Sequence, residues 1–194
     1  EYLRSIQLKN KKKPKYDGYC RDIIEILNKP YVIRFKNPED GNVHFFDGVY
    51  GDIIINNNEL DDLILSRSDG IPTYNFVAVV DDIEMKITHV IRGADHITNT
   101  ARQINIYNAL GFPYPKFYHI PIILNDIGKR LSKRLNSASV SYFYNSGFLS
   151  KALLNYLLML GWSYYDREIF SLNEMIIFFD IEKIHLSSVR FNFK

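Results

Sequence analysis

The sequence predicts an α/β fold in which a mostly β region is followed by a parallel strand–helix–strand unit and then by helices. Residues 1–66 hold short alternating segments separated by turn residues, which is typical of strands. Residues 87–124 hold two apolar segments on either side of a helical pattern, and a crossover of that kind joins parallel strands. Beyond residue 138, apolar residues recur at helical spacing.

The composition is that of an ordinary folded protein. Of the 194 residues, 46% are hydrophobic and 24% are charged, which is enough apolar material for a sizeable core. The formal net charge of +2 gives no support for a DNA-coating protein, so any nucleic-acid contact must be local. Cys20 is alone, which excludes an internal disulfide and favours a reducing compartment. No apolar run reaches the roughly 18 residues of a membrane-spanning helix, and no membrane partner is expected.

The N-terminal region is expected to contain loops and short elements. Residues 1–15 are polar and basic and predict a solvated loop, with a phosphate contact as the alternative. Residues 21–28 predict a short helix that ends before Pro30. Short strands are expected at residues 31–36, where apolar residues alternate with others on a half-buried face, and at residues 43–46 and 51–55.

The clearest pattern is a strand, a helix and a second strand. Residues 87–91 predict a buried strand, and residues 117–124 predict another. Between them, Ile97, Ala101, Ile104, Tyr107 and Leu110 fall at helical spacing and predict a helix. The residues expected at its ends are Asn99 or Thr100 as the N-cap and Gly111 just past the last turn.

The C-terminal region is expected to be helical. One predicted helix has a single apolar stripe and ends before Gly161. The stripe consists of Leu149, Leu153, Tyr156, Leu157 and Leu160. Ser171 and Glu174 form a capping box that predicts the start of a further helix.

A basic loop follows the second strand and is the first candidate site. Residues 125–138 are polar, with Leu131 as one apolar anchor and with cations at Arg130, Lys133 and Arg134. Ligands of open α/β sheets bind beyond the carboxyl ends of strands, and a lysine there can reach a phosphate as a point charge. The loop is therefore a candidate phosphate site, with a solvated cationic loop as the alternative.

Two more candidates lie near strand ends and turns. Arg92 could hold a carboxylate through two parallel hydrogen bonds, and Asp95 could accept hydrogen bonds from a ribose. A structural pair of Arg92 with Asp95 or Asp82 is the alternative. Tyr74 follows a turn at residues 68–73 and could donate its hydroxyl, or it could be a buried tyrosine of a core helix.

Other polar residues carry weaker signals. Asp81 and Asp82 could bind a cation, but adjacent acids are more typical of a cap or a turn. His119 lies in an apolar strand pattern and is expected to be a core histidine. The five histidines show no close metal-ligand spacing, so no metal site is expected.

Taken together, these segments resemble the class I glutamyl-tRNA synthetases over essentially the whole chain. The RLSKR segment at residues 130–134 is similar to the KMSKS loop of that family, although Arg130 stands where the motif has lysine. The other matching segments are YDGYCR at 16–21, RSDGIPTYNF at 67–76, ITHVIRG at 87–93 with Asp95 and His96, and LGWS at 160–163.

The resemblance implies a reaction and a set of roles. ATP and L-glutamate would form glutamyl-adenylate, and the glutamyl group would pass to the 3′ end of tRNA(Glu). Tyr74 and Arg92 would bind L-glutamate. The residues implied for ATP are Asp95, Arg130 and Lys133, and those implied for catalysis are Arg130, Ser132 and Lys133. Mg²⁺ would accompany ATP, held mainly by phosphates and water.

The resemblance also implies an organisation and a setting. Residues 1–66 would belong to a connective, tRNA-acceptor-binding insertion, residues 67–135 to the second half of a Rossmann-like catalytic domain, and residues 136–194 to a helical stem-contact region. A monomer in the cytoplasm is expected. The lone Cys20 argues against the zinc that some members of the family bind.

Departures from the family leave alternatives open. The HIGH-type motif and the anticodon-binding region are not in these residues, so an internal segment of a longer enzyme is expected. Asn75 stands where histidine is frequent. A glutamyl-queuosine tRNA synthetase or a glutaminyl-specific relative is the alternative enzyme, and a catalytically silent tRNA-binding segment is the alternative of another class.

Overall fold

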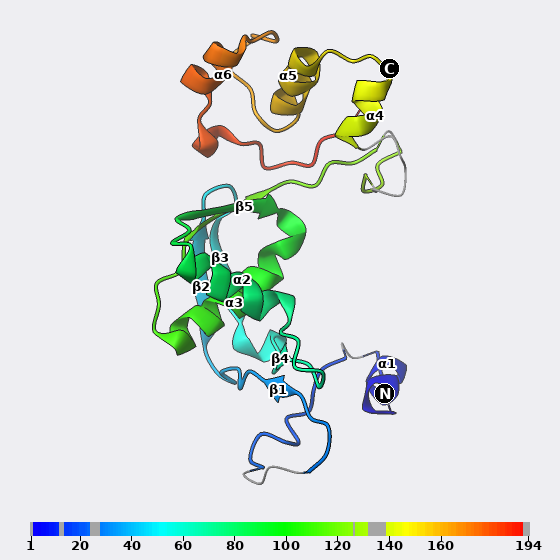
Figure 1. Ribbon diagram of the computed structural model, residues 1–194, viewed down its shortest axis with the longest axis vertical. Helices are drawn as coiled ribbons and strands as arrows, with labels where there is room; N and C mark the ends of the chain where they lie inside the picture. Colours follow the sequence, from blue (N-terminus) through cyan, green and yellow to red (C-terminus); the bar gives the residue numbers. More distant parts are fainter. Residues whose placement is uncertain (1, 12–13, 24–27, 126, 132–138, 192–194) are drawn as a thin grey trace. The chain divides into compact units, whose positions relative to one another are not determined.

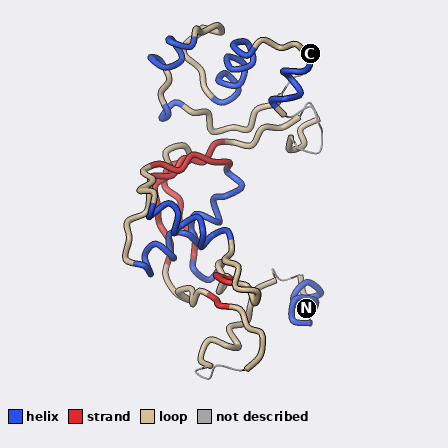
Figure 2. Tube along the Cα trace, viewed as in Figure 1, coloured by secondary structure: helices blue, strands red, loops and turns tan. Residues whose placement is uncertain are grey.

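The computed structural model describes residues 2–11, 14–23, 28–125, 127–131 and 139–191. It confirms a mixed α/β fold, with strands before residue 121 and helices and loops after it (Figures 1 and 2). The strands are β1 (Ile33–Arg34), β2 (Asn42–Asp47), β3 (Gly51–Asn56), β4 (Ile64–Ser66), β5 (His89–Gly93) and β6 (Lys116–Ile120). The α-helices are α1 (Tyr2–Lys9), α2 (Tyr74–Glu84), α3 (Ile97–Leu110), α4 (Val140–Asn145), α5 (Ser150–Gly161) and α6 (Leu172–Phe178). Among the described residues, none of the helices has both the length and the apolar character needed to span a membrane.

The main sheet has four strands in the order β3-β2-β6-β5. β5 and β6 pair in parallel with Arg92 opposite His119, and α3 connects them, which confirms the predicted strand–helix–strand unit. β2 also pairs in parallel with β6, with Asp47 opposite Phe117. The carboxyl ends of β2, β6 and β5 therefore meet at one edge, where ligands of α/β sheets bind.

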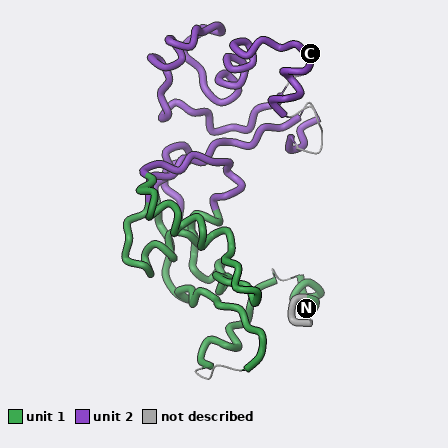
Figure 3. The backbone as a smooth tube through the Cα atoms, viewed as in Figure 1, with its two compact units in different colours: residues 1–45, 54–87, 98–114 green, residues 46–53, 88–97, 115–194 purple. Residues whose placement is uncertain are grey.

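The chain divides into two compact units, each made of several segments (Figure 3). The first comprises residues 1–45, 54–87 and 98–114, and the second comprises residues 46–53, 88–97 and 115–194. In the first unit, the buried residues Val79, Ile106 and Tyr107 pack with Phe35 and Phe76. The hydroxyl of Tyr107 donates to Asp82 near the end of α2, so a hydrogen bond also connects α3 to α2 in this core.

The described residues of the second unit include two apolar clusters. In one, Phe143, Leu160 and Phe191 pack with the predicted anchor Leu131. In the other, Trp162, Phe170 and Met175 form the buried centre. The predicted stripe of α5 is confirmed for Leu153, Tyr156 and Leu160. Leu149 and Leu157 are 75% and 41% exposed, so their part of the prediction was wrong; Leu149 precedes the helix as its N-cap.

Three predictions for the N-terminal region were wrong or only partly right. Residues 2–9 form α1 instead of a loop, because helix-compatible residues continue up to the lysine run. Arg21 and Asp22 lie in a turn, and residues 24–27 of the predicted helix lie outside the described residues. The predicted strand at 31–36 shrinks to Ile33–Arg34, paired with β4, and Ile33 is 52% exposed.

Helix α3 confirms the predicted helix but not its N-cap. It starts at Ile97 directly after a 3₁₀ turn, and Thr100 is fully buried within it. Gly111 follows the helix with φ +75°, as predicted. Its N–H donates to the Asn108 carbonyl and that of Phe112 to the Tyr107 carbonyl, which is the Schellman pattern.

The predicted capping box of α6 is present. The Ser171 hydroxyl accepts from the N–H of Glu174 at 3.3 Å, and the Glu174 carboxylate accepts from the N–H of Ser171 at 2.8 Å. Arg167 forms an ion pair with the same carboxylate. The hydrogen bonds from the Ser171 backbone and side chain, together with the Arg167 contact, lower the pKa of Glu174 from 4.5 to about 2.

We expect Glu174 to give α6 an acid-sensitive contribution to stability. Because the folded-state pKa lies below 4.5, this contribution is complete above about pH 4.5 and is lost as the pH falls towards about 2. Glutamine can still form a capping box, so Glu174→Gln removes the titration and keeps the geometry. The thermal unfolding midpoints of wild type and Glu174→Gln should converge across that interval. A constant difference would contradict the prediction, and Glu182→Gln, at an exposed position, is the matched control.

Candidate functional site

Three side chains from adjacent strands form a row at the carboxyl edge of the sheet. Asp47 ends β2, His119 lies in β6, and Arg92 lies opposite His119 in β5. The alternating burial of β2 places Val43, Phe45 and Asp47 on its buried face. The sequence proposed Arg92 as a binding residue and His119 as a core histidine, but it did not single out Asp47.

Asp47 and His119 form a fully buried pair. Both side chains are 0% exposed, and His119 Nδ1 lies 2.6 Å from Asp47 Oδ2. The Asp47 carboxylate also accepts from the backbone N–H groups of Val49, Tyr50 and His119. Burial by itself raises the pKa of Asp47, but the hydrogen bonds from His119 and from the backbone outweigh it and lower that pKa below its ordinary value.

Arg92 contacts this pair from the half-buried end of the row. Its Nε donates to His119 Nε2 at 3.3 Å, and its guanidinium carbon lies 5.6 Å from the centre of the Phe117 ring. The sequence left open an ion pair with Asp95 or Asp82; the partner that the structure gives for Arg92 Nε is His119. The expectation that His119 is a core histidine is confirmed by its complete burial.

Asp95 and Arg130, which sequence reasoning placed in two separate candidate sites, are brought together. Arg130 Nη2 lies 2.8 Å from Asp95 Oδ2, and the two side chains are 62% and 29% exposed. Burial raises the pKa of Asp95, but the hydrogen bond and the charge of Arg130, together with smaller contributions from His96 and the backbone, outweigh it and lower that pKa below its ordinary value. Gly93 lies two residues before Asp95, and a Cβ at this position would lie only 2.6 Å from Asp95 Oδ1, so a glycine suits this turn.

Leu131 anchors the described part of the basic loop within the second unit. Leu131 donates its N–H to the Ile123 carbonyl and packs in the cluster around Phe143. Arg130, directly before it, stays exposed beside Asp95. Ser132, Lys133 and Arg134, which carry the rest of the predicted loop, lie outside the described residues.

Tyr74 belongs to the first unit and is the first residue of α2. Its side chain is 55% exposed, so the alternative of a buried core tyrosine was wrong. The turn before it is built as predicted: Asp69 accepts from the N–H of Ile71, and Arg67 donates its N–H to the Ile71 carbonyl. Thr73 then precedes the helix as its N-cap. Tyr74 is thus presented at a helix start by a hydrogen-bonded turn.

Asp81 and Asp82 lie on α2 rather than in a cap or turn. Asp82 accepts a hydrogen bond from Tyr107. Within the described ranges, no group of three or more histidine, cysteine, aspartate or glutamate side chains could hold a metal ion.

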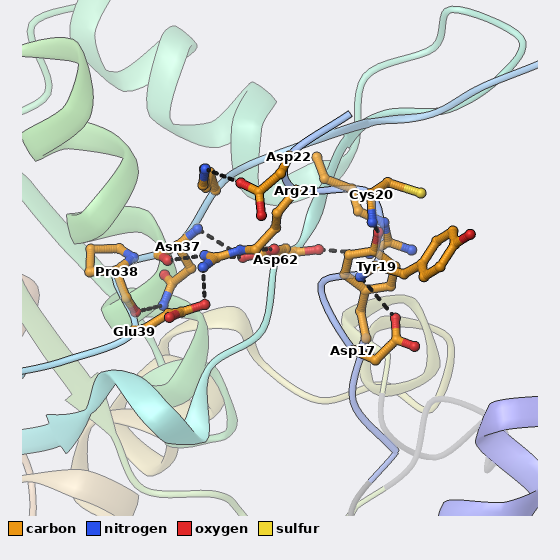
Figure 4. A network of polar contacts seen from close by, with 12 residues as sticks. Asp17, Tyr19, Cys20, Arg21, Asp22, Asn37, Pro38, Glu39 and Asp62 are labelled. Carbon is orange, nitrogen blue, oxygen red and sulfur yellow. Dashed lines mark hydrogen bonds and ion pairs between the residues drawn. The ribbon is translucent and has the colours of Figure 1, made fainter. Parts of the chain in front are cut away.

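A polar network in the first unit escaped sequence reasoning (Figure 4). Arg21 contacts both carboxylate oxygens of Asp62, at 2.6 and 2.9 Å, and also contacts Glu39 and the Asn37 carbonyl. Burial raises the pKa of Asp62, and the hydrogen bond from Arg21 does most to lower it below its ordinary value. The network lines a cavity of about 120 Å³. Its members are far apart in sequence, so no local pattern could have found it.

Comparisons with known proteins match the whole chain. The model of the class I tRNA synthetases (E and Q), catalytic domain, matches residues 1–194. A glutamate–tRNA ligase of Legionella pneumophila (strain Paris) is 58% identical over 194 residues, which are 100% of this chain and 41% of that protein. Glutamate–tRNA ligase 2 of Coxiella burnetii (strain Dugway 5J108-111) is 56% identical over 191 residues, or 98% of this chain and 41% of that protein.

A solved structure agrees in fold. The crystal structure of a glutamate tRNA ligase from Elizabethkingia meningosepticum, in complex with its amino acid, superposes with a TM-score of 0.86 at 34% sequence identity. The match covers 98% of this chain and 45% of that one. The chain thus spans less than half the length of the relatives that it matches. With its full length matched by the family model, the chain belongs to the class I tRNA synthetase family specific for glutamate and glutamine, within the catalytic domain.

Proposed function

We propose that this chain is part of a glutamate–tRNA ligase, which activates L-glutamate with ATP and transfers the glutamyl group to the 3′ end of tRNA(Glu). The observation that carries the proposal is the 58% identity over all 194 residues to a protein of that name. Both relatives described above bear that name, which favours glutamate over the glutaminyl alternative.

Arg92 and Tyr74 are the proposed contacts of L-glutamate. Glutamate carries two carboxylates, and an arginine fork is suited to one of them because it can donate two parallel hydrogen bonds. The position of Arg92 at the carboxyl edge of the sheet supports this role. The exposure of the Tyr74 side chain at the start of α2 supports its role as a hydroxyl donor.

The proposed ATP site combines the two segments that Asp95 and Arg130 bring together. Asp95 would accept from the ribose, and Arg130 and Lys133 would bind phosphates. Arg130, Ser132 and Lys133 are the proposed catalytic residues. The 2.8 Å contact between Asp95 and Arg130 supports a shared location. Mg²⁺ would enter with ATP, bound by phosphates and water, and we assign no residue of this chain to it.

tRNA is the proposed macromolecular partner. We propose that residues 1–66 form part of the acceptor-binding insertion, that residues 67–135 complete the catalytic domain, and that residues 136–194 begin the stem-contact region. The cytoplasm is the proposed location, which the exposed and unpaired Cys20 thiol supports because a reducing compartment tolerates it.

Aminoacylation by the full-length protein tests the proposal. We expect ATP-dependent attachment of labelled L-glutamate to tRNA(Glu), with little or no attachment of L-glutamine to tRNA(Gln). Preferential formation of glutaminyl-tRNA would favour the glutaminyl alternative. Failure to release pyrophosphate with any combination of glutamate and tRNA would favour a silent tRNA-binding protein.

A further inference from the structure

We propose that His119, held by Asp47, is a positioning residue that fixes the guanidinium of Arg92 for L-glutamate. The inference rests on the proposed role of Arg92 as a contact of L-glutamate. Asp47, His119 and Arg92 come from three neighbouring strands and form one continuous hydrogen-bonded row.

The row has one consistent arrangement of protons. The Arg92 Nε carries a hydrogen and has no lone pair to accept with, so His119 Nε2 must be the acceptor in their 3.3 Å contact. The hydrogen of the neutral imidazole then resides on Nδ1, which donates to Asp47 Oδ2 at 2.6 Å. Asp47 is ionised in this arrangement, and its four backbone and side-chain donors agree with a carboxylate acceptor.

This arrangement restricts the side chain of Arg92. The imidazole is completely buried, and its ring is fixed at both nitrogens. The Nε of Arg92 is directed at a fixed acceptor, so the plane of the guanidinium is set by that contact and by the nearby Phe117 ring. A bidentate contact with a carboxylate then uses the two terminal nitrogens of Arg92. Holding a binding group in one geometry before the ligand arrives lowers the entropic cost of binding.

A histidine kept only for packing would not need this chemistry. An apolar residue of similar size could fill the fully buried position, whereas a polar side chain there must find partners for both ring nitrogens. One of these partners is the half-buried arginine next to the edge where ligands bind. Hydrogen bonds from a second layer of residues commonly hold a functional side chain in place, and the buried carboxylate and imidazole form such a layer behind Arg92.

Two replacements of His119 separate its contacts. The amide nitrogen of asparagine occupies the place of Nδ1, so His119→Asn keeps a donor for Asp47 and loses the acceptor for Arg92. The amide oxygen of glutamine reaches the place of Nε2, so His119→Gln keeps the acceptor for Arg92 and loses the donor for Asp47. Both variants are made in the full-length enzyme, with Arg92→Ala as the reference.

The steady-state constants for L-glutamate and ATP are measured in the aminoacylation assay. We expect His119→Asn to raise the KM for L-glutamate by about tenfold, which corresponds to one lost hydrogen bond, and to leave the KM for ATP within about twofold. His119→Gln should stay within about threefold for both substrates, although it is expected to unfold at a lower temperature. Equal KM values for L-glutamate in the two variants, or equal changes for L-glutamate and ATP, would overturn the inference.

The reference variant separates this inference from the proposed function. If wild type charges tRNA(Glu) and Arg92→Ala raises the KM for L-glutamate at least tenfold, the proposed function and the role of Arg92 both stand. An unchanged KM in Arg92→Ala would overturn the positioning inference while leaving glutamate–tRNA ligase activity in place. Absence of activity in the wild type would remove both.

The tautomer gives a readout that does not depend on turnover. Selective ¹⁵N labelling of histidine in the wild-type enzyme reports which ring nitrogen carries the hydrogen, and the His119 signals are assigned by their absence from His119→Gln or His119→Asn. We expect a neutral ring protonated at Nδ1. A ring protonated at Nε2, or at both nitrogens, cannot accept from Arg92 and would overturn the inference.

Discussion

Lys133→Ala in the full-length protein is expected to slow the formation of glutamyl-adenylate by about 10²-fold or more. In the proposed reaction, attack on the α-phosphate of ATP spreads negative charge over its oxygens, and a lysine held in the loop would stabilise that charge. Losing one such group typically costs about 3–4 kcal/mol of transition-state stabilisation. Pyrophosphate exchange, measured with ATP, L-glutamate and tRNA present, follows the step directly.

Lys129→Ala is the matched control, because it removes the same charge from an exposed position four residues earlier. An exposed charge contributes about 0–1 kcal/mol, so the control should lose no more than about fivefold. Exchange at the wild-type rate in Lys133→Ala would contradict the role of Lys133. A loss shared equally by both variants would indicate that the loop acts only through its total charge.

The sequence predicted best those elements whose pattern extends over many residues. The 14 residues of α3 contain several helical repeats and end at a glycine, so its position and C-terminus were predictable. Its start was not, because the chain enters the helix through a 3₁₀ turn over Ala94–His96, and the expected cap Thr100 is buried inside. Local propensity cannot distinguish a polar residue that caps a helix from one that the core requires.

The length of a short strand depends on the strand with which it pairs, and not only on its own sequence pattern. The alternation over residues 31–36 predicted a half-buried face, but β4, its partner, is three residues long. Only Ile33–Arg34 therefore pairs, and Phe35 reaches the core while Ile33 remains exposed. The length of β4 is set elsewhere in the chain, so residues 31–36 could not reveal it.

For the candidate site, the sequence identified residue types but not their contacts. Arg92, Asp95 and Arg130 follow apolar strand patterns, which is where binding residues of α/β sheets lie. The contact of Arg92 with His119 depends on the register of β5 against β6, 27 residues apart. One local signal could have identified Asp47. It continues the alternation of Val43 and Phe45, which predicts that its side chain lies on the buried face of the strand. A buried carboxylate requires a hydrogen-bonding or charged partner.

Asp47→Ala is expected to lower the free energy of unfolding of the second unit by about 3–5 kcal/mol, because each buried donor left without its acceptor typically costs about 1–3 kcal/mol and several are left at once. The change leaves the imidazole Nδ1–H of His119, whose side chain is 0% exposed, and the N–H groups of Val49 and Tyr50 without their acceptor. Hydrogen exchange of the β6 amides in the full-length protein measures the loss, because their protection reports local opening.

Asp52→Ala is the matched control, since it removes an exposed carboxylate from the neighbouring strand β3. Surface substitutions of this kind usually change stability by no more than about 0.5 kcal/mol. Protection of β6 that falls equally in both variants would show that the Asp47 pair contributes no more than a surface charge. A loss of protection in Asp47→Ala alone would show that this sheet edge is stabilised by the same carboxylate that orients His119. The stability of the edge and the position of the Arg92 side chain would then depend on one buried contact.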